Sequence, residues 1–165
     1  MKVYFDMDGV LADFDRGVEE LAGFHILKQD EADKTSDEEM WQRIKEVGHY
    51  YDKLKLMPGA KEMFDAVYGK LREDCQILTG IPKPKRGIQD AGEDKTKWVR
   101  RLLSEDIVIN ICFKEEKKNF CTGPDCILVD DLLPNIEAWR ACGGTGIHHK
   151  SSAETMKILR DMGVL

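Results

Sequence analysis

The chain has 165 residues, of which 42% are hydrophobic and 34% are charged, and its formal net charge is −6. These values are typical of a single globular domain and exclude disorder as the default state. The acidic balance argues against broad electrostatic binding, so no stable nucleic-acid complex is expected. No apolar stretch approaches the roughly 20 residues of a membrane span, and the first residues do not resemble a signal peptide, so we expect a cytoplasmic protein with no membrane partner.

The first part of the chain is expected to form one strand and three helices. Residues 3–5 are an apolar run that ends at two aspartates, which indicates a short buried strand. Apolar periodicity predicts a helix over about 14–27. The sequence Ser36-Asp37-Glu38-Glu39 fits a capping box, so a second helix over 36–47 is expected to begin there. Residues 60–71 have the amphipathic pattern of a third helix.

From residue 75 onward, apolar runs that indicate strands alternate with amphipathic runs that indicate helices. The expected order is strand 75–79, loop 80–89, helix 92–103, strand 107–113, loop 114–125, strand 126–129, helix 134–139, strand 145–148 and a terminal helix capped by Ser151.

This alternation predicts an α/β fold, a three-layer Rossmann-like parallel sheet with helices on both faces. The helical stretch 14–57 interrupts the alternation directly after the first strand. We therefore expect a single domain over residues 1–165. Its core would comprise residues 1–13 and 58–165, and residues 14–57 would form a small helical cap inserted after the first strand.

The cysteines and the paired histidines are expected to be structural. The cysteine number is odd and no Cys-x-x-Cys pair occurs, so we expect free thiols in a reducing compartment. His148 and His149 lie on a predicted strand, where adjacent side chains point to opposite faces, so they are not expected to share a metal ion. The cysteines are Cys75, Cys112, Cys121, Cys126 and Cys142.

Polar side chains follow several of the predicted strands at the point where each strand ends. Ligands of open parallel sheets bind beyond the carboxyl ends of the strands, so these side chains are expected to converge in one crevice. The set comprises Asp6 and Asp8 after the first strand, Thr79 and Gly80 after the second, the lysine-rich segment 114–118 after the third, and Asp130 and Asp131 after the fourth.

The chemistry of this set favours phosphoryl transfer. Carboxylates that are brought together repel one another and remain ionised only beside a cation. Mg²⁺ binds oxygen ligands and keeps positions for water and a substrate phosphate. A threonine hydroxyl, backbone N–H groups near Gly80 and a lysine are suitable donors for phosphate oxygens. A glycosidase would need the two carboxylates but not the lysine and threonine.

The pattern resembles the haloacid dehalogenase superfamily of phosphatases. That superfamily has a DxDx(V/T) segment, then a Ser or Thr, then a Lys, then an acidic pair, and the chain has Asp6-x-Asp8-x-Val10, Thr79, a lysine among 114–118 and Asp130-Asp131 in this order. More narrowly, the chain is similar to the 5′(3′)-deoxyribonucleotidase family. The segments that carry this similarity are residues 6–14, Met57-Pro58-Gly59-Ala60, Lys95-x-x-Trp98-Val99 and residues 127–131.

The resemblance implies a role for each matching residue. Asp6 would be the nucleophile that forms an aspartyl-phosphate, and Asp8 would be the general acid and base. Thr79, Gly80 and Lys117 would bind the phosphoryl group, with Lys118 as the alternative lysine. Mg²⁺ would be the cofactor, held by Asp6, the backbone carbonyl of Asp8, and one or both of Asp130 and Asp131. Phe14 and Trp41 would lie against a nucleobase.

Three functions remain as hypotheses. The first is a Mg²⁺-dependent phosphomonoesterase for a small phosphorylated substrate, namely a 5′-nucleotidase acting on (deoxy)ribonucleoside monophosphates. The second is a phosphatase of the same superfamily for a non-nucleotide metabolite or a nucleic-acid 3′-phosphate. The third is a non-enzymatic phospho-acceptor similar to a response-regulator receiver, against which the second aspartate and the cap both argue.

Overall fold

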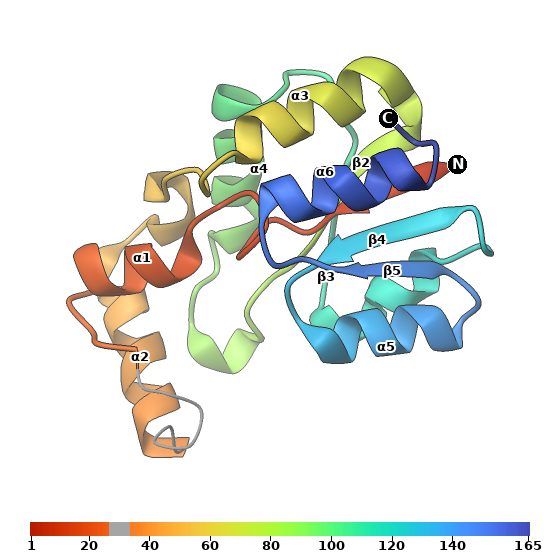
Figure 1. Cartoon of the computed structure of the whole chain (residues 1–165). Helices are drawn as coiled ribbons and strands as arrows, with labels where there is room; N and C mark the ends of the chain where they lie inside the picture. Colours follow the sequence, from red (N-terminus) through yellow and green to blue (C-terminus); the bar gives the residue numbers. More distant parts are fainter. Residues whose placement is uncertain (27–33) are drawn as a thin grey trace.

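The computed structural model of the chain describes residues 1–26 and 34–165. The described residues form one parallel sheet of five strands in the order β3-β2-β1-β4-β5 (Figure 1). Phe5 lies opposite Ile77 on one side and Val129 on the other, so neighbouring strands end at similar heights. The strands are β1 (Lys2–Phe5), β2 (Cys75–Gly80), β3 (Ile109–Cys112), β4 (Cys126–Asp130) and β5 (Thr145–His148).

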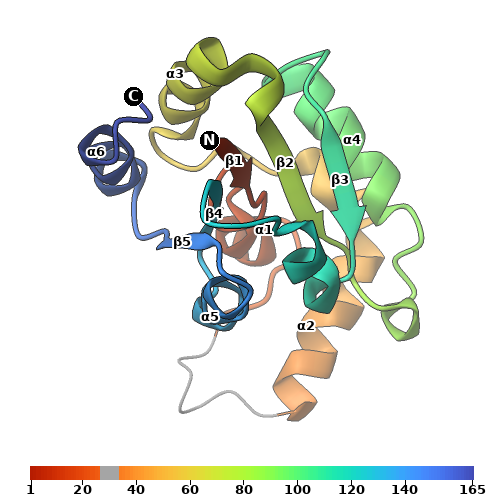
Figure 2. The same cartoon turned by 90° about the vertical axis from the view of Figure 1, so that its right-hand side faces the viewer.

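Helices cover both faces of the sheet, because alternate side chains of its central strands are buried in two separate apolar clusters (Figure 2). Val3 and Phe5 belong to the larger cluster, which packs under α3 (Ala60–Leu71), α4 (Ala91–Leu102) and α6 (Ser152–Asp161). Tyr4 belongs to the smaller cluster, under α5 (Leu133–Ala141) and the 3₁₀ helix η4 (Lys114–Phe120). The predicted three-layer α/β fold is therefore confirmed.

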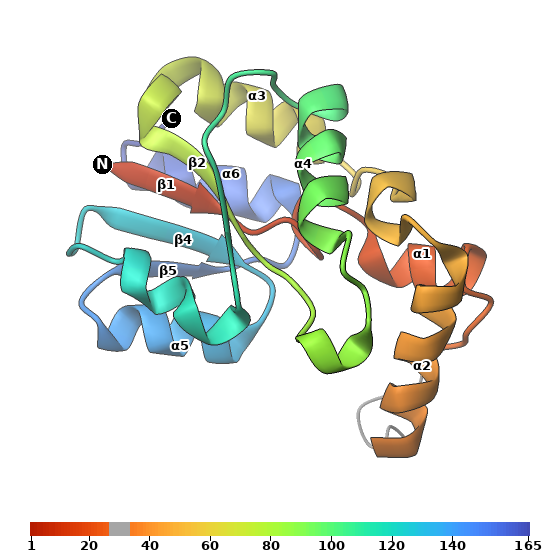
Figure 3. The same ribbon diagram turned by 180° about the vertical axis from the view of Figure 1, so that it is seen from behind.

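Three helical elements lie beyond the carboxyl ends of the strands, which point toward them in Figure 3. They are α1 (Phe14–Glu20), α2 (Lys34–Val47) and the 3₁₀ helix η1 (Tyr50–Lys53). The two chain segments that connect them to the sheet run side by side, and the Met57 N–H donates to the Leu11 carbonyl at 2.8 Å. These elements fall within the predicted cap 14–57, and the division of the chain into core and cap stays a prediction.

Several element boundaries differ from the sequence-based expectation. The first helix ends at Glu20, because the chain turns at Gly23 with a positive φ of 61°, so its predicted extension toward Leu27 is wrong. Leu27 itself lies outside the described residues. The strand predicted over 107–113 is shorter, and the loops over 80–89 and 114–125 contain the 3₁₀ helices η3 (Pro84–Arg86) and η4. In η4 the Phe113 N–H donates to the Glu116 carboxylate at 2.7 Å and starts the helical turn.

Other local predictions are confirmed. The helix 60–71 and the strand 145–148 have the expected bounds, and the Ser151 hydroxyl caps α6 by accepting the Glu154 N–H at 3.2 Å. All five cysteines are free. The His148 ring lies 2.9 Å from the Asp131 carbonyl, whereas His149 is buried 2.8 Å from the Thr155 hydroxyl, so the two rings diverge. In the described parts of the chain, no helix has the length and apolar character needed to span a membrane.

Candidate active site

The carboxyl ends of β1 and β4 bring three aspartates together. Asp6 follows β1, and its N–H donates to the Val129 carbonyl at 2.9 Å, which fixes it beside the end of β4. Oxygens of Asp6, Asp130 and Asp131 all lie within 4.8 Å of one another. Asp6 is 5% exposed and Asp130 is fully buried. The predicted convergence of the first and fourth strand ends is therefore present.

Lys117 is the lysine that reaches this acidic cluster. Its Nζ lies 2.8 Å from Asp6 Oδ1 and 2.8 Å from Asp130 Oδ2, and the side chain is buried. Lys118 is exposed, whereas Lys114 lines the same pocket as Lys117. A 3₁₀ helix has three residues per turn, so η4 directs Lys114 and Lys117 to the same side and Lys118 away from it. Lys117, and not Lys118, therefore lies at the acidic cluster, and its predicted role in phosphate binding stays a prediction.

Asp130 is held by three donors. Its Oδ1 accepts the Leu132 N–H at 2.8 Å, and its Oδ2 accepts from Asn135 Nδ2 at 3.0 Å in addition to Lys117. Sequence reasoning missed Asn135, which stands in the first turns of α5 and points back toward the strand end. The three donors fix the orientation of the Asp130 carboxylate within the cluster.

The electrostatics of the cluster indicate an excess of negative charge. Burial raises the pKa of Asp6 to about 6, with Asp130 and Asp8 adding to the rise and Lys117 opposing it. Burial also raises the pKa of Asp131 to about 7, together with repulsion from Asp6 and Asp130. For Lys117 burial acts to lower the pKa, but Asp6 and Asp130 raise it above its ordinary value. Three carboxylates beside one ammonium group form a donor set of hard oxygens that fits a divalent cation such as Mg²⁺.

Gly9 makes room for this cluster. Its φ is +77°, and a Cβ at this position would lie 2.2 Å from Asp131 Oδ2. No other residue type satisfies both conditions, because side chains rarely adopt this backbone conformation and the carboxylate occupies the space. The glycine that separates Asp8 from Val10 is therefore a requirement of the acidic cluster.

We expect Gly9→Ala to weaken divalent-cation binding by displacing Asp131, in addition to a backbone penalty of about 1–2 kcal/mol. The matched control is Gly143→Ala, where φ is +85° but nothing lies within 4 Å of the added Cβ. Thermal denaturation and Mg²⁺ titration of both variants separate the two effects. Equal Mg²⁺ affinity in the two variants would contradict the proposed crowding of Asp131.

The Asp8 carboxylate is paired with a lysine of α4. Its Oδ2 accepts from Lys95 Nζ at 2.6 Å, and the same ammonium group donates to the Thr79 hydroxyl at 2.9 Å. Thr79 and Lys95 are fully buried. The Asp8 carboxylate is bonded to Lys95. The predicted metal ligand is instead the backbone carbonyl of Asp8, and this role stays a prediction.

Sequence reasoning did not assign a site role to Lys95, although a signal was present. Lys95 shares the inner face of α4 with Ala91, Trp98 and Val99, all of which are buried. The same buried stripe contains Asp94, and a buried lysine is uncommon unless its charge has a partner. The partner, Asp8, is 87 positions away in the sequence, so only the fold identifies the pair.

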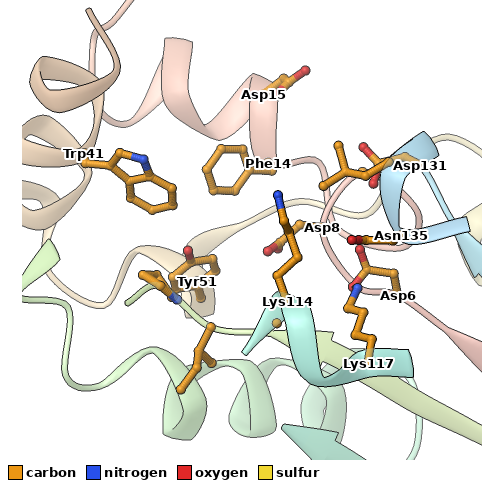
Figure 4. Close-up of a pocket in the computed structure, with 15 residues that line it drawn as sticks. Asp6, Asp8, Phe14, Asp15, Trp41, Tyr51, Lys114, Lys117, Asp131 and Asn135 are labelled. Carbon is orange, nitrogen blue, oxygen red and sulfur yellow. The ribbon is translucent and has the colours of Figure 1, made fainter. Parts of the chain in front are cut away.

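These groups border a cavity of about 350 Å³ with an acidic floor and an aromatic wall (Figure 4). In the wall, the Phe14 ring lies 6.0 Å from Trp41 and 6.3 Å from Tyr51, between ring centroids. Thr79 and Asp130 are buried beneath the cavity. Its lining comprises Asp6, Asp8, Gly9, Phe14, Asp15, Trp41, Tyr51, Gly80, Ile81, Pro82, Lys114, Lys117, Asp131, Leu132 and Asn135.

Solved hydrolases share this architecture. A HAD-superfamily hydrolase from Ehrlichia chaffeensis superposes with a TM-score of 0.50 at 14% identity, covering 98% of this chain and 96% of that one. A hydrolase from Streptococcus pneumoniae TIGR4 superposes with a TM-score of 0.51 at 12% identity, covering 96% and 97%. The chain has the haloacid dehalogenase fold. In this fold, the acidic cluster and Lys117 stand at the carboxyl edge of the sheet, where the sequence placed them.

A sequence relative agrees with the structural comparison. A protein of Vibrio phage KVP40, named "Putative 5′(3′)-deoxyribonucleotidase", is 27% identical over 140 residues, which are 81% of this chain and 67% of that protein. No protein-family model matches the chain. Together with the haloacid dehalogenase fold, this likeness supports a phosphatase-type hydrolase.

Proposed function

We propose that the protein is a Mg²⁺-dependent phosphomonoesterase that hydrolyses nucleoside monophosphates. The observation that carries the proposal is the placement of Asp6 on the floor of the cavity, beside Asp130, Asp131 and Lys117. A carboxylate in this position can approach a phosphorus atom only if the negative charges around it are offset. Mg²⁺ bound by Asp6, Asp130 and Asp131 would neutralise charge on the phosphoryl oxygens and on the cluster.

The proposed reaction has two displacements. First, a carboxylate oxygen of Asp6 forms a bond to phosphorus while the bond to the leaving oxygen breaks, and Asp8 gives its proton to that oxygen. The Asp8 carboxylate then takes a proton from water, and the water oxygen attacks phosphorus as the Asp6–phosphorus bond breaks. Free phosphate, the alcohol and the starting carboxylates result. Lys117 and the Thr79 hydroxyl would stabilise charge on the phosphoryl oxygens during both displacements.

The aromatic wall supports a nucleotide as the substrate. The cavity lies within the size range of small-ligand sites, and Phe14, Trp41 and Tyr51 face the space beyond the acidic floor (Figure 4). Trp41 is held in place by Arg86, whose guanidinium carbon lies 5.4 Å from the indole centroid and which pairs with Asp37 at 2.7 Å. A fixed aromatic surface at this position suits stacking against a base. The relative from Vibrio phage KVP40 is consistent with this substrate class.

The test is a phosphate-release assay across ribo- and deoxyribonucleoside monophosphates, deoxyribose 5-phosphate and a 3′-phosphorylated oligonucleotide, with Mg²⁺ or with EDTA. Trp41→Ala is expected to raise KM for nucleotides roughly 10-fold, since stacking on an aromatic side chain contributes about 1–3 kcal/mol per base. The KM for deoxyribose 5-phosphate, which has no base, should not change. Tyr68→Leu, an aromatic substitution on α3 outside the cavity lining, is the control.

Each outcome of the panel has a defined meaning. Turnover of nucleotides that depends on Trp41 supports the proposal. If only the oligonucleotide or only the sugar phosphate is hydrolysed, the proposed nucleotide substrate is wrong and that compound is the substrate. Transfer of a single phosphoryl group to the protein without release of phosphate would instead indicate a phospho-acceptor.

A further inference from the structure

The buried ammonium group of Lys95 donates all its protons to neighbouring protein groups. Lys95 is 0% exposed, and its Nζ donates to Asp8 Oδ2 at 2.6 Å, to Thr79 Oγ1 at 2.9 Å and to the Gly80 carbonyl at 2.6 Å. The ring centroid of Tyr51 lies 4.6 Å from the same atom. An ammonium group has three protons, so no proton of Lys95 is free to bind a substrate oxygen. Lys95 must therefore act through its neighbours.

Lys95 occupies only one of the two oxygens of Asp8. Among the described residues, Asp8 Oδ1 is buried and has no hydrogen-bond partner, whereas Oδ2 is bonded to Lys95. A buried polar atom without a partner is costly unless a ligand supplies one. Asp8 borders the cavity with a side chain that is 27% exposed, and Oδ1 is the carboxylate oxygen to which no described protein group donates. The bond to Lys95 fixes the orientation of the carboxylate at the edge of the cavity.

Lys95 also sets the direction of the Thr79 hydroxyl. Because Lys95 donates to Thr79 Oγ1, that oxygen acts as an acceptor on one side, and its own proton must point elsewhere. The alternative acceptor, the Gly80 carbonyl, is 3.5 Å away, at the limit of a hydrogen bond. Among the described residues, no acceptor therefore holds the hydroxyl proton at close range, and the next residue, Gly80, lines the cavity.

We propose that Lys95 is a positioning residue for phosphoryl transfer, which orients Asp8 for proton exchange with the leaving group and Thr79 for donation to the phosphoryl group. The inference rests on the proposed function. Its three contacts join α4 to the residues that follow β1 and to the end of β2, so one side chain aligns groups from separate elements. A purely structural lysine would stabilise the fold without affecting proton transfer in particular.

Leaving-group dependence distinguishes these two roles. The alkoxide of a nucleoside needs a proton as it departs, whereas 4-nitrophenolate is a weak base that departs without one. The kcat/KM value covers the steps up to departure of the leaving group. We expect Lys95→Met to lower kcat/KM about 100-fold for a deoxyribonucleoside monophosphate, as for the loss of an aligned general acid, and less than about 10-fold for 4-nitrophenyl phosphate.

Further variants serve as controls for this comparison. Lys97→Met changes an exposed lysine on the same helix, paired with Glu93, and should leave both kcat/KM values unchanged. In the Asp8→Asn background, Lys95→Met should cause no additional leaving-group-dependent loss, because the group through which it acts is absent. If Lys95→Met does not fold, as judged by circular dichroism, Lys95→Gln retains a hydrogen-bond donor and takes its place in the same comparison.

The outcomes separate the inference from the proposed function. If the wild-type protein turns over neither substrate, the proposed function fails and the inference fails with it. If the wild type is active but the Lys95 variant loses kcat/KM equally for both substrates, or loses none, Lys95 does not position Asp8. A selective loss for the nucleotide that disappears in the Asp8→Asn background supports the inference.

Discussion

Asp6→Asn is expected to abolish phosphate release, lowering kcat by at least about 10³-fold, because the amide cannot form the bond to phosphorus that begins the reaction. The substitution keeps the shape of the side chain, and the amide oxygen can still accept a hydrogen bond from Lys117, which also remains paired with Asp130. The loss of activity should therefore occur in a folded protein. Initial rates at saturating substrate and circular dichroism of the same preparation provide the measurement.

The thermal stability of Asp6→Asn gives an independent check. Burial, together with repulsion between the carboxylates, raises the pKa values of Asp6 and Asp131, and Asp6→Asn removes one buried charge from the cluster. The metal-free variant should therefore melt at the same temperature as the wild type or higher. Asp106→Asn, at an exposed position before β3, is the control for the chemical change itself. Acid-quenched wild-type protein should also carry a phosphoryl group that the Asp6 variant lacks in mass spectrometry. Near-normal turnover by Asp6→Asn would show that another group is the nucleophile.

The fold and the acidic cluster could be predicted because both depend on local patterns. Short apolar runs that alternate with amphipathic helices define a parallel sheet, and the carboxyl ends of adjacent strands share one edge. Asp6 and Asp130 needed only to follow their strands to become neighbours, which the structure confirms. The same logic located Thr79 at the end of β2.

The remaining parts of the site depend on geometry that the sequence does not specify locally. The inward position of Lys117 follows from the three-residue turn of η4, in a segment whose polar composition predicted a loop. The pairing of Lys95 with Asp8 depends on the packing of α4 against the sheet, across a long sequence separation. The position of Tyr51 beside Phe14 depends on where η1 returns to the sheet. Side chains at strand ends were therefore easier to predict than those contributed by helices.

Removal of divalent cations is expected to abolish activity and to make the free energy of unfolding fall as the pH rises. Burial raises the pKa of Asp131 from 3.8 in the unfolded chain to about 7, and that of Asp6 to about 6. Between the unfolded-state pKa of about 4 and the folded-state pKa of about 7, the folded state binds more protons than the unfolded state. The free energy of unfolding of the metal-free protein must therefore fall as the pH rises from about 4 to about 7. Above that window it should level off.

Mg²⁺ competes with these protons for the same oxygens, so its stabilising effect should grow across the same window. A cation at 100 times its Kd contributes about 2.7 kcal/mol, which corresponds to a rise in Tm of roughly 5–10 °C for a domain of this size. We expect this rise at about pH 8 and a much smaller one at about pH 5, where protons occupy part of the cluster. In Asp131→Asn, the Mg²⁺-dependent rise at the higher pH should largely disappear. An equal Mg²⁺ effect at both pH values would place the cation away from Asp6 and Asp131, and activity in excess EDTA would exclude it from the reaction.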